Sequence, residues 1–100
     1  MTDQQPLVAV PAHPGAGDQV IFEARRQADE VVLPVFSSVR ALVAALGESQ
    51  PWAILPLSTV RESVSAGGAD RVVIDPEVTA EAWRWEPQDL GGFAWPGRRG

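Results

Sequence analysis

The chain has 100 residues, of which 45% are hydrophobic, with a net charge of −5 and no cysteine. This length and composition predict one globular domain with a modest core, and the lack of cysteine excludes disulfides, thiolate metal sites and a cysteine nucleophile. All basic residues are arginines, and their clusters are only pairs. Such an acidic chain is a poor binder of nucleic-acid backbones, which need several positive charges on one face.

The first five residues lack the basic start and long apolar segment of a signal peptide. No apolar stretch approaches the length of a membrane span. We therefore expect a cytoplasmic protein that makes no contact with a membrane.

The N-terminal third is predicted to contain an antiparallel hairpin. Leu7–Pro11 is a short apolar run and is the first expected strand. A second strand is expected over residues 19–24, and the polar segment 25–29 is short enough to turn the chain into a third strand over residues 31–36. Pro34 in this third strand removes one backbone donor, which predicts an edge position or a bulge.

Two strand–helix–strand units are predicted to follow. Residues 31–36, 52–57 and 71–76 contain apolar runs without alternation, which is typical of parallel strands covered on both faces. The first connecting helix is expected over 39–46, between a Ser-Ser start and a glycine stop. The second is expected to begin at Thr59, with a capping box closed by the glutamate three residues later.

The predicted fold class is therefore α/β with mixed character: a five-stranded mixed sheet, in which the antiparallel hairpin precedes two β-α-β units. The two helices cover one face of the sheet or are split between its faces. The side chains expected to be buried are Val35, Leu42, Leu46, Ile54, Val73 and Ile74. Residues 1–76 form the predicted domain, and residues 77–100 form a tryptophan-rich C-terminal segment that contains several prolines and glycines.

Three segments resemble one known family. They are the Val32–Ser38 block with its following amphipathic helix, Gln50-Pro51-Trp52, and Val72–Pro76. Together they are similar to the N-terminal domain of SseB-like proteins over Leu7–Pro76. The closest resemblance is to small stand-alone members of high-GC bacteria, some encoded near specialised secretion systems. The resemblance implies an α/β accessory or interaction domain without established catalytic residues.

A search for catalytic chemistry finds little. His13 is the only histidine, and its neighbours are prolines and glycines, so we expect a loop residue without a ligand or base role. No nucleophile elbow or phosphate-binding loop is present. We therefore expect no enzyme, no metal and no cofactor.

One group of polar residues would come together if the three apolar strands were parallel, because the carboxyl ends of such strands meet at one edge of a sheet, where ligands often bind. A small polar or anionic ligand sensor is therefore the alternative function. The competing interpretation is that these residues cap helices and the end of a strand. The group consists of Ser37, Ser38, Ser58, Thr59 and Asp75.

The aromatic residues of the C-terminal segment favour a protein partner. Tryptophan is enriched at binding hot spots. Trp83 and Trp85 are predicted either to fold back over the sheet or to bind a partner, and both possibilities stay open. Phe93 and Trp95 lie among glycines and a proline, and residues 86–100 are expected to lack regular structure. For these two we favour burial against another protein or a second copy of the chain.

Overall fold

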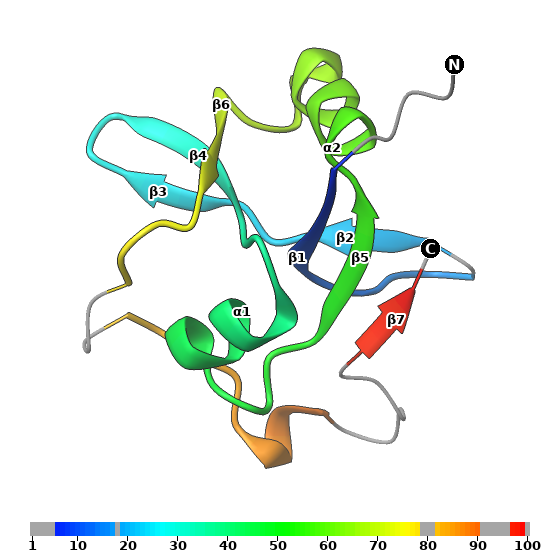
Figure 1. The fold of residues 1–100 in the computed structure, drawn as a ribbon, viewed down its shortest axis with the longest axis vertical. Coiled ribbons are helices and arrows are strands. Elements are labelled where there is room, and N and C mark those ends of the chain that lie inside the picture. The colour runs from blue at the N-terminus through cyan, green and yellow to red at the C-terminus, as the bar shows by residue number, and fades with distance from the viewer. Residues whose placement is uncertain (1–5, 18, 79–81, 91–96, 100) are drawn as a thin grey trace.

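The computed structural model describes residues 6–17, 19–78, 82–90 and 97–99. Within these ranges the chain forms a mixed α/β fold with two sheets, ordered β2-β1-β5-β7 and β3-β4-β6 (Figure 1). The strands are β1 (Leu7–Pro14), β2 (Val20–Phe22), β3 (Arg25–Gln27), β4 (Glu30–Val35), β5 (Trp52–Pro56), β6 (Arg71–Ile74) and β7 (Gly97–Arg99). The helical elements are α1 (Val39–Leu46), α2 (Leu57–Ser63), the π-helical turn η1 (Val64–Gly68) and the 3₁₀ turn η2 (Pro87–Leu90). The α/β class is confirmed, but the single five-stranded sheet is wrong.

The two sheets meet at one backbone bridge. In the first sheet, β1 pairs antiparallel with both β2 and β5. In the second, β4 pairs antiparallel with β3 and parallel with β6. Ala9 of β1 and Phe36, just after β4, exchange two N–H···O=C bonds of 2.8 Å. This bridge holds the two sheets together through their central strands.

The predicted hairpin is present, but its first strand was placed too early. β4 pairs with Arg25–Gln27, the polar segment that was expected to be the turn. The turn itself is shorter and uses Ala28 at a positive φ of 55°. Val20–Phe22 pairs with β1 instead. Pro34 lies beyond the last β4 residue that pairs with β3, so its missing N–H removes no hydrogen bond to that strand.

The parallel pairing is confirmed for β4 and β6 but not for β5. Five residues of β5 pair antiparallel with β1, from Leu7 opposite Pro56 to Pro11 opposite Trp52. The expected pair of β-α-β units sharing one sheet is therefore wrong. An apolar run shows that a strand is covered on both faces, but it does not show which strand lies beside it.

The two helices lie on opposite faces of β1 (Figure 1). A split between faces was one of the two predicted arrangements. α2 covers a core cluster that includes Val8, Val10 and Val35. α1 covers a second cluster that includes Ala9 and Phe36. Successive side chains on a strand point to opposite faces, so Val8 and Ala9, which are neighbours on β1, belong to different clusters.

The predicted core is correct for three of its six residues. Val35, Leu42 and Leu46 are fully buried. Ile54 and Val73 are half-buried. Ile74 is 50% exposed, so its predicted burial is wrong. β6 is an edge strand of its sheet, which leaves the last of its side chains uncovered.

Helix α1 has the predicted bounds because its start and stop signals are local. The Ser38 hydroxyl accepts a hydrogen bond of 3.0 Å from the Ala41 N–H, and Gly47 follows the helix at a φ of 96°. Helix α2 begins at Leu57, two residues before Thr59, and has no side-chain cap. The predicted capping box is therefore wrong, because Pro56 starts the helix with its fixed φ of −60°. Val60 is buried and Val64 packs against the same core, as expected.

Ser38→Ala is expected to lower the free energy of unfolding by about 1 kcal/mol, the usual loss when a serine cap is removed. Urea unfolding followed by circular dichroism measures this change. Ser65→Ala, at an exposed serine of η1, is the matched control and should leave the stability unchanged. Equal stabilities of the two variants would contradict the capping role of Ser38.

The C-terminal segment contains more regular structure than predicted. Pro87–Leu90 forms a 3₁₀ turn, in which the Asp89 carboxylate accepts a hydrogen bond of 2.8 Å from the Glu86 N–H. β7 pairs parallel with β5. Gly97 lies so close to the Trp52 ring that an added Cβ would come within 2.3 Å of it. Phe93 and Trp95 lie outside the described residues.

Candidate functional site

The Glu23 carboxylate, just after β2, connects three separate parts of the chain. Oε2 lies 2.8 Å from Nδ1 of His13. The indole N–H of Trp85 donates to both carboxylate oxygens at 3.1 Å. The buried Gln50 amide donates to Oε1 at 3.3 Å and to the Pro51 carbonyl at 2.7 Å. The side chain of Glu23 is only 13% exposed, so these bonds form in a largely water-excluded place.

His13 is not the loop residue that the sequence predicted. It lies in β1, opposite Ile21 of β2. Its ring centroid is 5.8 Å from that of Trp85, in a tilted contact. The first strand was expected to end at Pro11, but β1 continues to Pro14 and its turn into β2 begins at Gly15, whose N–H donates to the Gln19 carbonyl. Because His13 lies opposite Ile21, the Glu23 side chain, two residues further along, reaches it diagonally across the strand pair.

Trp83 and Trp85 have different surroundings. Trp85 folds back on the sheet, where Glu23 accepts its indole N–H and most of its surface is covered. The Trp83 ring packs edge-on against the Trp85 ring, with 5.8 Å between the two ring centroids. Trp83 is 61% exposed, the largest fraction among the large hydrophobic side chains in the described ranges.

Two arginines of β3 lie beside Trp83. Nη1 of Arg25 is 3.5 Å from the Trp83 carbonyl oxygen. Desolvation by burial lowers the pKa of Arg25, an effect that Glu23 opposes and Arg84 reinforces. Nε of Arg25 is buried and has no hydrogen-bond partner among the described residues. Within residues 6–17, 19–78, 82–90 and 97–99, the ion pairs join His13 to Glu23 and Arg71 to Glu30, so neither Arg25 nor Arg26 belongs to one.

Trp83 and Arg25 separate two surface grooves. The first groove has a volume of about 440 Å³; Arg26 lies on its side, and Val32, Pro34 and Val78 supply its apolar surface. The second, of about 490 Å³, is lined by aromatic rings, those of His13, Phe22 and Trp85. We call Trp83, Arg25 and these two grooves the Trp83 face.

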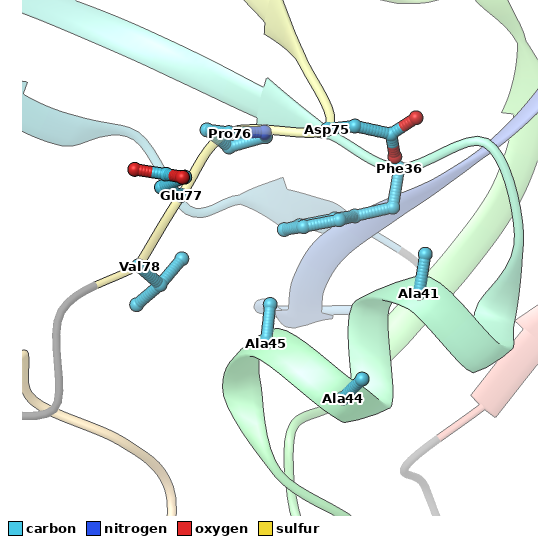
Figure 2. Close-up of a pocket in the computed structure, with 8 residues that line it drawn as sticks. All are labelled: Phe36, Ala41, Ala44, Ala45, Asp75, Pro76, Glu77 and Val78. Carbon is cyan, nitrogen blue, oxygen red and sulfur yellow. The ribbon is translucent and has the colours of Figure 1, made fainter.

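A third groove, of about 590 Å³, lies between α1 and the segment after β6. Figure 2 shows Pro76 and Val78 on one side of it, the methyl groups of Ala41 and Ala45 on the other, and the Phe36 ring between them. Its walls are mostly apolar. The Asp75 carboxylate at its rim already accepts a hydrogen bond of 2.9 Å from the Ser37 N–H.

The predicted polar edge is only partly assembled. Ser37, Ser38 and Asp75 come together where β4 and β6 end, but Ser58 and Thr59 belong to α2, which follows β5. β5 leads into α2 from the other sheet, so its carboxyl end does not join that edge. The capping interpretation holds for Ser38 and Asp75, which bond backbone N–H groups.

The described residues that line the Trp83 face are mostly apolar, aromatic or charged. The side chains lining its two grooves include no hydroxyl or thiol nucleophile. In the described part of the chain, no group of three or more His, Asp or Glu side chains is placed to hold a metal ion. None of the described helices is long and apolar enough to cross a membrane.

Residues 1–82 match the family model of the SseB protein N-terminal domain. The chain belongs to the SseB family. No curated protein and no solved structure matches it. The SseB match includes His13, Glu23 and Arg25 but ends before Trp83. The Trp83 face therefore joins residues of the SseB domain to two tryptophans that follow it.

Proposed function

We propose that this SseB-family chain is a non-enzymatic, cytoplasmic accessory module that binds another protein through the Trp83 face. The observation that supports this function is the exposure of Trp83, 61%, on a side chain held in place from below. Tryptophan is enriched at binding hot spots, and a soluble chain seldom exposes one next to concave apolar surface without a partner. The family resemblance favours a partner in a bacterial assembly such as a specialised secretion system.

The support beneath Trp83 strengthens this proposal. Trp85 is fixed by hydrogen bonds to Glu23, and Trp83 rests on its ring. The Trp83 backbone is held through the contact of its carbonyl with Arg25. A side chain already ordered in the free protein loses little conformational entropy when it binds, so more of the contact energy appears as affinity.

The geometry favours this function over the two alternatives. Catalysis at the Trp83 face would need a free general base, but the Glu23 carboxylate is shared among three donors. Ligand sensing at the polar edge would need free polar groups, but Ser38 and Asp75 are engaged by backbone N–H groups. Trp83, in contrast, keeps most of its apolar surface available.

Trp83→Ala is expected to weaken partner binding about 30-fold, which corresponds to the roughly 2 kcal/mol typical of a hot-spot residue. Peptides that bind the immobilised full chain would be selected from a phage-displayed random library. The dissociation constants of synthetic copies would then be measured by fluorescence polarisation. Because Trp83 is exposed, the melting temperature of the variant should stay unchanged.

Leu7→Ala is the matched control, because Leu7 is 52% exposed at the end of β1 far from His13. It should bind the selected peptides as well as the wild type does. Equal affinity of the Trp83→Ala variant would overturn the proposal. Sedimentation velocity tests the second-copy alternative: a dimer that Trp83→Ala abolishes would show that the partner is the chain itself.

A further inference from the structure

We infer that the outer edge of β5 is a strand-binding site, and that the chain's own β7 occupies this site. The ligand class is an extended peptide that adds a strand to the sheet and carries a glycine at the position that meets the Trp52 ring. Trp52 lines neither groove of the Trp83 face, so this is a second site, beyond the proposed function.

The edge of β5 and the strand that covers it come from different parts of the chain. The SseB match ends at residue 82, so it includes β5 but not β7. Among the matched residues that the structure describes, β5 pairs with β1 alone, and its other edge is open. β7 lies along this edge, parallel to β5, with Gly97 opposite Trp52 (Figure 1). An open edge presents a row of backbone donors and acceptors, so the SseB domain itself carries the strand-binding site.

The contact between Gly97 and Trp52 determines which strand fits. A Cβ added at Gly97 would lie 2.3 Å from Cζ2 of the Trp52 ring and 2.7 Å from Cε2 and Cη2. Such separations are too short for any real Cβ, so the ring or the strand would have to move. The ring is restricted, because Trp52 packs against the core cluster that contains Phe36 and Leu42. Side chains larger than that of glycine are therefore excluded at this position of a bound strand.

The pairing of β7 with β5 is of a kind that another strand can replace. β7 has three residues, and its pairing is parallel, which is slightly less stable per residue than antiparallel pairing. In strand addition the main-chain hydrogen bonds provide affinity, and local pockets provide specificity. A strand from another molecule with glycine at the same position finds the same bonds and the same pocket. β7 is therefore an internal competitor, and an external strand binds β5 only when β7 leaves.

Gly97→Val in the full chain is expected to release β7 from β5, because the valine side chain has no room beside Trp52. The probe is a fluorescein-labelled peptide with the sequence of residues 91–100, and its binding is followed by fluorescence polarisation. It should bind the variant at least about tenfold more tightly than the wild type, in which the tethered strand competes at an effective concentration on the order of mM. Hydrogen exchange of the β5 amides should be faster in the variant and slow down again when the peptide binds.

Three controls show what the peptide recognises. The Gly97→Val form of the peptide keeps Phe93 and Trp95 and should not bind. The protein variant Ala16→Val adds the same bulk at an exposed alanine in the turn after β1, and should behave as the wild type does. Adding Trp83→Ala to the Gly97→Val protein should leave the affinity for the peptide unchanged, because the Trp83 face is a different site.

Each contrary outcome overturns the inference. Equal binding of the two peptides would show that their aromatic side chains are recognised and not the strand. Unchanged exchange of the β5 amides in Gly97→Val would show that Trp52 gives way to a side chain. Loss of peptide binding on adding Trp83→Ala would place the peptide on the Trp83 face, which supports the proposed function instead. Failure of the proposed function leaves the β5 site standing, because none of its evidence involves Trp83.

Discussion

Leu42→Ala is expected to lower the free energy of unfolding by about 2–5 kcal/mol, the cost of leaving a cavity in a packed core. Leu42 is fully buried in the cluster that contains Phe36 and Leu46. A domain of this size has a total stability of only about 5–15 kcal/mol, so the variant should unfold at a much lower urea concentration. Equilibrium urea unfolding followed by tryptophan fluorescence measures the change.

The control for Leu42→Ala is the same chemical change at Leu7, which is 52% exposed. Leu7→Ala should change the stability by less than about 0.5 kcal/mol, as most surface substitutions do. If Leu42→Ala were no more destabilising than Leu7→Ala, the packing of α1 on the sheet would be contradicted.

Glu23→Ala is expected to lower the free energy of unfolding by about 3 kcal/mol, because a hydrogen bond to a charged group contributes about 1.5–3 kcal/mol and three donors lose their acceptor. The amide of the fully buried Gln50 would lose one of its two acceptors. Loss of the bond to Trp85 should also expose the indole, which tryptophan fluorescence reports as a red shift of the folded protein.

Glu62→Ala, at an exposed glutamate of α2, is the matched control and should alter neither the stability nor the emission. The stability of Glu23→Gln should lie between those of the wild type and Glu23→Ala, because the amide oxygen of Gln still accepts a hydrogen bond. Because the Trp83 ring packs against Trp85, the affinity for the selected peptides should be highest for the wild type, lower for Glu23→Gln and lowest for Glu23→Ala. A Glu23→Ala variant with wild-type stability and emission would show that the carboxylate does not hold the Trp83 face together.

Helix α1 shows what local sequence signals can predict. Its start depends on Ser38 and its end on Gly47, and both signals act within a few residues of the helix. The apolar runs also identified β1, β4, β5 and β6 as strands and the parallel pairing of β4 with β6, but not the polar strand β3 or the partner of β5. β5 lies beside β1 because of contacts between residues more than forty positions apart, and no local pattern encodes that choice.

The candidate site shows the same division. The tryptophans near the C-terminus were enough to single out Trp83 and Trp85, but not to choose between folding back over the sheet and binding a partner. The support beneath Trp83 was missed, because Trp85 and Glu23 are 62 residues apart in the sequence. Arg25-Arg26 was regarded as a pair too small to form a binding patch, and residues 25–29 were expected to be a turn. In the structure Arg25–Gln27 is a strand next to β4, and Nη1 of Arg25 lies 3.5 Å from the Trp83 carbonyl oxygen.

The division of β1 between two cores has a consequence for which changes of length the chain tolerates. Val8 and Val10 belong to the cluster under α2, and Ala9, between them, belongs to the cluster under α1. Inserting one residue before Val8 leaves this alternation intact, whereas inserting one between Ala9 and Val10 turns every later side chain to the opposite face. His13 would then point away from Glu23, so the spacing from Ala9 to His13 links the packing of the core to the assembly of the Trp83 face.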